Sequence, residues 1–390
     1  MDLELSSDDI EFRDGLREVF LGEIPADIRR RSALNQTTRD DIVDSQRILH
    51  RHGLAVPHWP VAWGGRDWSA TQSHIYGSEL QRAAVPQPLA FNVSMVGPII
   101  AEFGSDAQKQ KFLPATANLD IWWSQGFSEP EAGSDLASLK TTARRDGDVY
   151  ILNGQKTWTT LGQYGDWMFV LARTDPDAPR KQQGISFLLL DLATPGIERR
   201  PITLVDGSAE VNEFFFDDVV VPVENLVGEE NKGWGYAKFL LGNERNSIAQ
   251  VGTAQRIYAD LAASAATTST GVGPLADDPD FRGSMHRIKT QLLALEATQL
   301  RVTGASEHGV ASPVSSLLKL EGTQALQELT RLRMTAAGAD ASLVTADGDL
   351  GADPAASASA TQYLNLRKLS IFGGSNEIQR GVIAKTILGL

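Results

Sequence analysis

Two short stretches, Ser128-Glu-Pro-Glu-Ala-Gly-Ser-Asp135 and Lys156-Thr-Trp-Thr-Thr160, carry the most information in this sequence. The first packs small residues, a proline and acids into a tight turn that exposes backbone N–H groups. The second, in a predicted strand, places Trp158 two residues before Thr160. A planar, electron-poor ring would use both, because Trp158 can stack on it, Thr160 can donate to a ring nitrogen, and Ser128 can bind its polar edge. Each stretch alone favours a polar turn or a strand with a core tryptophan, but in this order they indicate a flavin.

In combination, the two stretches resemble the signature segments of the acyl-CoA dehydrogenase family. Ile371-Phe-Gly-Gly-Ser-Asn-Glu-Ile-Gln-Arg380 resembles a third segment, so the resemblance covers nearly the whole chain. It implies FAD as cofactor, an acyl-CoA thioester as substrate and an electron-transfer flavoprotein as electron acceptor. The residues that it assigns to the flavin are Phe127, Ser128, Gly133, Ser134, Trp158, Thr160, Ser375 and Glu377.

The composition is that of a globular protein with room for two or three domains, since 42% of the 390 residues are hydrophobic and 22% are charged. No run of about eighteen apolar residues marks a membrane span. The acidic N-terminus lacks a signal-peptide pattern and the chain has no cysteine, so we expect a cytoplasmic protein without disulfides or thiol catalysis. Six scattered histidines lack metal-ligand spacing, and we assign no metal. The net charge of −13 argues against nucleic acid as a partner.

The predicted fold class is a multidomain α+β protein of the acyl-CoA dehydrogenase type. Hydrophobic periodicity changes from helical to strand-like and back along the chain. We expect an N-terminal helical domain, a central β-barrel or sandwich domain on the flavin-ring side, and a C-terminal four-helix bundle that carries the base. Their expected bounds are 1–119, 120–228 and 229–390.

Local signals mark several element ends. Ser6-x-x-Asp9 is a predicted capping box at a helix start, and Thr38-x-x-Asp41 is a second predicted helix start. Asp146-Gly147 and Asn153-Gly154 are predicted hairpin turns around a strand. A long helix is expected from just after Gly233 to about Ala266.

Acyl-CoA α,β-dehydrogenation, the reaction that the resemblance implies, needs two adjustments of ordinary groups. A carboxylate must be desolvated to become a stronger base for the α-proton. The thioester oxygen must also receive hydrogen bonds that stabilise enolate charge.

The sequence departs from the commonest family pattern at the base. Many members place a Glu immediately before the glycine that matches Gly374, but here that position is Gly373, which has no side chain. Glu244 is the alternative, because Leu240, Glu244 and Ile248 form an i, i+4, i+8 stripe that is otherwise apolar. The stripe alone favours a helix-surface Glu paired with Arg. Some branches of the family, however, carry their base at this position, so the resemblance assigns proton abstraction to Glu244 and thioester-oxygen binding to the Gly373 N–H.

The resemblance assigns fewer residues to the acyl-CoA than to the flavin. The resemblance places Ser134 and Asp135 along the pantetheine channel. It places Arg245 at the CoA end or beside an acidic neighbour, although a solvated helix charge is equally typical of Arg245.

Two further family motifs, which bind the FAD of a neighbouring subunit, are missing. Where an Arg-x-x-Phe-Gly loop is expected, the chain reads Ser269 to Pro279, without Arg and with two adjacent acids that would repel a pyrophosphate. Where a Gln and a Gly-Gly-x-Gly turn are expected, it reads Arg333 to Asp340, without either. We therefore expect one subunit of a hetero-oligomer of the α2β2 type, with a paralogous partner completing the site. The alternative is a homotetramer with a shifted motif, in which Arg282 supplies the charge.

Other functions stay open at this stage. The same fold serves oxidases and flavin monooxygenases, and a non-catalytic paralogue within an oligomer is a third possibility. Retention of Ser128, Trp158 and Thr160 speaks against the third. Such split-site members resemble enzymes that act on CoA esters of bulky or dicarboxylic acids, including steroid side chains and pimeloyl-type chains. The sequence itself does not identify the acyl group.

Overall fold

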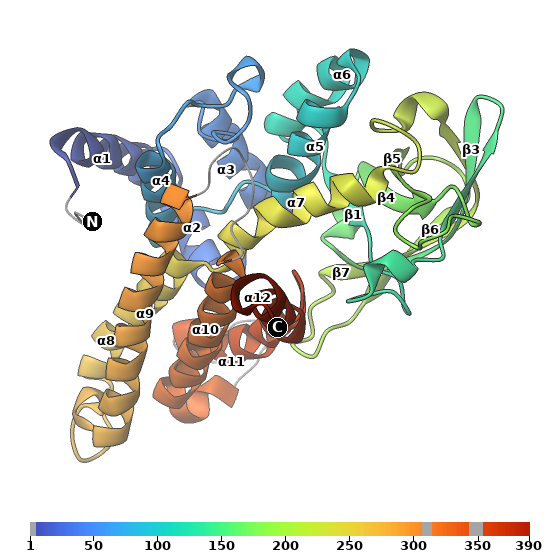
Figure 1. The fold of residues 1–390 in the computed structure, drawn as a ribbon. Coiled ribbons are helices and arrows are strands. Elements are labelled where there is room, and N and C mark those ends of the chain that lie inside the picture. Colours follow the sequence, from blue (N-terminus) through green and yellow to red (C-terminus); the bar gives the residue numbers. More distant parts are fainter. Residues whose placement is uncertain (1–4, 306–313, 343–353) are drawn as a thin grey trace. The chain divides into compact units, whose positions relative to one another are not determined.

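The computed structural model describes residues 5–305, 314–342 and 354–390, without the side chains at 241–248, 303–305, 342, 354 and 357 (Figure 1). The chain folds into two compact units. The bundle unit comprises Met1–Asp41, Trp68–Gln87 and Arg245–Leu390, and the sheet unit comprises Ile42–Asp67 and Pro88–Glu244. The boundary between the two units falls inside a helix, α7 (Gly233–Ile248).

The sheet unit is built on a seven-stranded sheet in the order β1-β4-β2-β3-β7-β6, with β5 also paired to β4. The pairing of β1 with β4 is parallel, whereas the long central pair of β3 and β7 is antiparallel. Alternate residues of these strands point into one apolar core, which contains Tyr150, Leu152, Phe214 and Phe216. The strands are β1 (Trp123–Gly126), β2 (Thr142–Asp146), β3 (Val149–Thr160), β4 (Trp167–Arg173), β5 (Ile185–Asp191), β6 (Ile197–Ile202) and β7 (Val211–Pro222).

Short helices accompany this sheet within the same unit. Asn92, which is fully buried, donates to the carbonyls of Thr116 and Ile121 and accepts from the N–H of Trp123. One amide side chain thus ties the helical segment to the start of β1. The helical elements are most of α3 (Arg39–Arg51), the 3-10 turn Val61–Trp63, the π-helix Phe91–Val96, α5 (Gly97–Phe103), α6 (Asp106–Ala117) and the first part of α7.

The described part of the bundle unit consists mainly of helices, of which α9 and α10 are the longest. Figure 1 shows α8 and α9 running side by side, and α10 also packs against both of them and against α11. Their shared core includes Ile257, Leu261, Leu292, Leu326 and Leu329. None of the described helices is long and apolar enough to cross a membrane. The helices are α1 (Ser7–Gly22), α2 (Ala26–Ala33), α4 (Ala70–Arg82), α8 (Val251–Thr267), α9 (Pro279–Ala305), α10 (Ser315–Ala337), α11 (Pro354–Asn365) and α12 (Asn376–Ile383).

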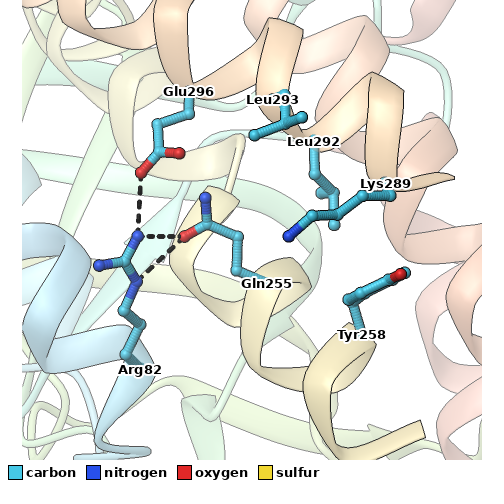
Figure 2. Close-up of a pocket in the computed structure, with 7 residues that line it drawn as sticks. All are labelled: Arg82, Gln255, Tyr258, Lys289, Leu292, Leu293 and Glu296. Atoms are coloured by element: carbon cyan, nitrogen blue, oxygen red, sulfur yellow. Dashed lines mark hydrogen bonds and ion pairs between the residues drawn. The ribbon is translucent and has the colours of Figure 1, made fainter. Parts of the chain in front are cut away.

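A polar pocket of about 230 Å³ in the bundle unit is organised by Arg82, the last residue of α4 (Figure 2). The Arg82 guanidinium donates to Gln255 Oε1 at 2.6 Å and to Glu296 Oε1 at 2.9 Å. These contacts join α4 to α8 and α9. The Lys289 ammonium lies 5.3 Å from the ring centre of Tyr258 on the same pocket wall. The pocket therefore lies at a polar junction between helices, and none of the predicted site residues lines it.

Both predicted helix starts are confirmed. The Ser6 hydroxyl accepts from the Asp9 N–H, and the Thr38 hydroxyl accepts from the Asp41 N–H. Only the second is reciprocal, because the Asp41 carboxylate also accepts from the Thr38 N–H at 2.9 Å. The hairpin at Asp146-Gly147 is confirmed as well, since Asp146 pairs with Val149 across it.

The hairpin predicted at Asn153-Gly154 is wrong. Strand β3 continues through both residues, and Gly154 sits at a register shift with φ of +145°. A Cβ at Gly154 would lie 2.5 Å from Thr141 Oγ1, so close approach of the neighbouring segment requires glycine there. Across the sheet, the Asn153 side chain donates to the Asp218 carboxylate and accepts from the Asp218 N–H. The dipeptide forms a β-bulge instead of a turn.

The single long helix predicted after Gly233 is also wrong. It breaks into α7 and α8 at Gln250, which has φ of +44°. The new helix starts because the Gln81 side-chain oxygen accepts from the N–H groups of Gly252 and Thr253 at 2.9 and 3.2 Å. This acceptor comes from α4, far away in the sequence, so the local pattern could not reveal the break.

Candidate active site

Trp158 lies on the surface of the sheet unit at a second bulge of β3. The register against β7 shifts between Lys156 and Thr159, and Trp158 has φ of +60°. Its side chain is 59% exposed, although those of the adjacent Thr157 and Thr159 are buried. A bulky residue with backbone angles in the left-handed region is strained, and such strain concentrates at functional sites. The interpretation of Trp158 as a core residue is therefore wrong, and the indole face is available to a ligand.

A buried ion pair connects the two sequence stretches. The Lys156 ammonium, which is 0% exposed, donates to Glu129 Oε1 at 2.7 Å and to the Phe127 carbonyl at 3.1 Å. The same Glu129 carboxylate accepts from the backbone N–H groups of Lys140 and Thr141 at 2.6 and 3.0 Å. Both charges are thus well hydrogen-bonded, as buried ions must be.

The pKa values of this pair follow from burial and mutual attraction. Burial lowers the pKa of Lys156 to about 8, even though the nearby Glu129 carboxylate opposes the change. Burial alone would raise the pKa of Glu129, but the Lys156 charge and the surrounding donors hold it below its ordinary value. The carboxylate therefore stays ionised at neutral pH.

The loop after β1 is held directly against the Trp158 bulge. The Thr157 N–H donates to the Ser128 carbonyl at 2.9 Å, which places Ser128 beside the residue that precedes Trp158. Phe127 is buried and packs edge-on against Phe169 and Phe187. The structure thus brings Phe127, Ser128 and Trp158 together, with Thr160 half-buried at the end of the same strand.

The end of this loop is exposed. Gly133, Ser134 and Asp135 all lie at the surface, and a side chain at position 133 would meet no atom within 4 Å. Asp135 forms an ion pair with Lys181 at 2.5 Å. Lys181 comes from a distant loop, and no pattern in the sequence singled it out.

The predicted residues of the C-terminal segment gather in the bundle unit. Gly373 and Gly374 form a left-handed turn with φ of +62° and +80°, which explains the paired glycines. Ser375 caps α12 by accepting from the Ile378 N–H at 3.3 Å. Glu377 is exposed in the first turn of α12, where hydrogen bonds from its own backbone N–H and from Ser375 lower its pKa.

The candidate base lies on α7, within the last residues assigned to the sheet unit. The side chains of Glu244 and Arg245 fall outside the described part of the chain. Their assigned roles therefore stay predictions.

The two regions that lack the family's partner motifs have local structural roles. Asp278, one of the adjacent acids, accepts from the Phe281 N–H at 2.8 Å and so caps α9. Leu275, in the same segment, is buried in the bundle core. In the second region Arg333 donates to Gln362 Oε1 at 2.7 Å, and α10 ends at the left-handed Gly338. The residues that replace the motifs thus serve the bundle itself.

The described residues fit the ring end of a flavin. The exposed indole of Trp158 lies in a strained bulge, and a hydrogen-bonded loop lies against that bulge. The buried Lys156–Glu129 ion pair connects the loop to the strand that carries the bulge. Such a surface offers one flat apolar face beside polar backbone groups, as a stacked heteroaromatic ring requires.

Comparison with known proteins agrees with this arrangement. The chain matches the N-terminal, middle and C-terminal domains of acyl-CoA dehydrogenases over residues 6–120, 124–219 and 231–388. It is 37% identical to the acyl-CoA dehydrogenase IpdE1 of Mycobacterium tuberculosis, over 87% of this chain and 85% of that protein. It is 33% identical to IpdE1 of Mycolicibacterium smegmatis over 97% of both chains.

Solved structures give the same result. A chain of the Tcur3481-Tcur3483 steroid acyl-CoA dehydrogenase aligns with a TM-score of 0.88 and 31% identity, over 100% of this chain and 99% of that one. A chain of the ChsE4-ChsE5 complex of Mycobacterium tuberculosis aligns with a TM-score of 0.85 and 31% identity, with the same coverage. The protein belongs to the acyl-CoA dehydrogenase family and is an oxidoreductase of that class. Its predicted fold class is confirmed, and membership implies FAD as the cofactor.

The buried ion pair generates a stability prediction. Replacing Lys156 with Met leaves the Glu129 carboxylate buried without its counter-charge, so we expect the free energy of unfolding to fall by about 3–5 kcal/mol. The matched control is Lys140→Met, which removes an exposed ion pair with Glu131 and is expected to leave the free energy of unfolding nearly unchanged. Urea unfolding followed by circular dichroism measures both. Similar losses in the two variants would contradict a special role for the buried pair.

The strained bulge generates a second prediction. Glycine tolerates the positive φ of Trp158, so Trp158→Gly should leave the free energy of unfolding of the flavin-free protein unchanged or raise it by about 1 kcal/mol. Co-purified with the expected paralogous partner, this variant should nevertheless hold less flavin per chain than the wild type. Asn35→Gly, at another positive-φ position outside the site, is the control and should bind flavin normally. A Trp158→Gly protein that unfolds more easily but binds flavin fully would show that the indole serves the fold.

Proposed function

We propose that this chain is the catalytic subunit of a mixed oligomer that binds FAD and converts an acyl-CoA thioester into its 2-enoyl-CoA. The observation that carries the proposal is Trp158, exposed and strained on a bulge that the Glu129–Lys156 pair fixes from beneath. The strained backbone does not stabilise the sheet. It turns the flat indole to the surface, where the indole can stack on the flavin ring. Beside this site, Ser128 and Phe127 supply the polar edge and the rigid aromatic support.

Bound FAD would accept the β-hydrogen of the substrate as a hydride. In this proposal the Glu244 carboxylate takes the α-proton, so that the substrate loses a proton and a hydride and gains a double bond. The Gly373 N–H donates to the thioester oxygen and stabilises the enolate charge that develops there. Ser134, Asp135 and Arg245 line the path of the CoA moiety, while Ser375 and Glu377 complete the flavin contacts.

The missing half of the FAD site supports a mixed oligomer. The segment Ser269–Pro279 offers no arginine to a pyrophosphate, and its Asp278 is committed to capping α9. Arg333 is likewise bonded to Gln362 within the bundle. Two related structures are, by their names, assemblies of two different chains. We propose that a paralogous subunit contacts the phosphate and adenosine end, in an α2β2 arrangement.

The substrate class is proposed from the same relatives. One of them is named a steroid acyl-CoA dehydrogenase, which favours a bulky steroid side-chain CoA ester over a straight-chain one. An electron-transfer flavoprotein is the proposed electron acceptor and the cytoplasm the proposed location. We also propose the domain bounds 1–119, 120–228 and 229–390.

Flavin stoichiometry tests the mixed oligomer. The chain should be purified alone and together with each paralogue encoded beside it, and FAD per chain measured by absorbance after denaturation. We expect little FAD in the chain alone and about one FAD per copy of this chain in the correct pair. Full occupancy in a homotetramer of this chain would contradict the split site.

Glu244→Gln tests the base. The substitution keeps the size and removes the basic carboxylate, so turnover of the best CoA ester should fall by at least about 10³-fold while FAD stays bound. Glu18→Gln on the exposed face of α1 is the control and should leave the rate unchanged. A Glu244→Gln complex with near-wild-type turnover would show that another group is the base.

A further inference from the structure

Lys319 is a buried lysine outside the groups assigned to the reaction above. It lies on α10, is 0% exposed, and donates from Nζ to the Gly374 carbonyl at 2.9 Å and to Asn376 Oδ1 at 3.1 Å. Removing an ammonium group from water is costly, and a methionine would fill similar volume without that cost. A lysine at this position therefore calls for a role beyond packing.

The partner of Lys319 is the glycine turn that precedes α12. Gln379, also fully buried, donates from Nε2 to the carbonyls of Gly373 and Gly374 at 2.9 and 3.3 Å. Both carbonyl groups of the turn are thus fixed by buried side chains. In the described part of the chain, by contrast, the Gly373 N–H makes no hydrogen bond. The turn is held by its acceptors and leaves this donor available.

The same face of α10 is anchored to the turn that precedes α8. Gly322 lies three residues after Lys319, on the same side of the helix. A Cβ at Gly322 would be 2.5 Å from the Ala249 carbonyl oxygen, so the backbones are in direct contact there. Because α10 cannot shift against Ala249, the Lys319 ammonium and the turn that it holds are fixed within the bundle unit.

We propose that Lys319 is a positioning residue for the dehydrogenation, which rests on the role proposed above for Gly373. It holds the Gly373–Gly374 turn so that the Gly373 N–H is oriented toward the thioester oxygen. Its charge also acts in a site of low dielectric, where a fixed cation favours a developing enolate more strongly than it would in water. Gln379 supplies the same restraint without the charge.

Lys319→Met in the co-purified, FAD-loaded complex separates this role from a structural one. The readouts are FAD per chain, kcat and KM, and the long-wavelength absorbance that appears when the 3-thia analogue of the best CoA ester loses its α-proton beside oxidised flavin. We expect kcat per bound flavin to fall by about 10²-fold, KM to change little, and the enolate absorbance to be lost. Gln379→Met should lower kcat less, because it removes hydrogen bonds and no charge. The control is Lys289→Met, an exposed lysine on α9, which should match wild type.

Two results would contradict a positioning role for Lys319. If Lys319→Met lowers thermal stability or FAD content but keeps wild-type kcat per bound flavin and full enolate absorbance, Lys319 serves only the fold. If that variant does not fold, the proposal is overturned by a Gln379→Met complex that holds FAD and keeps the wild-type rate and absorbance. Failure of the proposed function is distinguishable, since the wild-type complex would then show neither turnover nor enolate absorbance.

Discussion

The ion pair between the Lys156 ammonium and the Glu129 carboxylate joins strand β3 to the loop after β1. The carboxylate fixes the loop by accepting from the N–H groups of Lys140 and Thr141, and the ammonium fixes the end of β1 through the Phe127 carbonyl. Since both ions are buried, neither segment can move away without exposing an unpaired charge. The position of Ser128, and the bulge that exposes Trp158, both depend on this pair.

A second restraint of the same kind operates in the bundle unit. There Lys319 and Gln379 hold the carbonyl groups of a glycine turn, just as Glu129 holds backbone N–H groups in the sheet unit. In both places a buried polar side chain fixes irregular backbone that presents functional groups. Regular secondary structure supplies the frame, and buried hydrogen bonds set the orientation of the site.

Sequence reasoning predicted the elements whose signals are local. The turn and strand around Ser128 and Trp158 were predicted, as were the caps at Ser6 and Thr38. It failed where a distant group decides the outcome. Asn153-Gly154 has the composition of a turn, but contact with Thr141 and Asp218 makes it a bulge. The break before α8 depends on Gln81, a residue of α4.

Charged residues show the same limit. A lysine inside a helix is ordinarily solvated, so nothing in the sequence marked Lys319 as buried, and its partners lie more than fifty residues further along the chain. Lys181 was missed beside Asp135 because the two residues lie 46 positions apart and meet only in the folded chain. The missing FAD motifs, on the other hand, were visible from sequence because they are absences of particular residue types, and the structure adds that Asp278 and Arg333 have other tasks.

In the proposed assembly this chain holds the flavin ring while another chain holds the phosphate end. A structure of the FAD-bound, co-purified complex by cryo-electron microscopy tests this division. We expect the isoalloxazine ring against Trp158 and Ser128, with the pyrophosphate contacted by a subunit of different sequence. A pyrophosphate bound by residues 269–279 of a second copy of this chain, or a ring remote from Trp158, would contradict it.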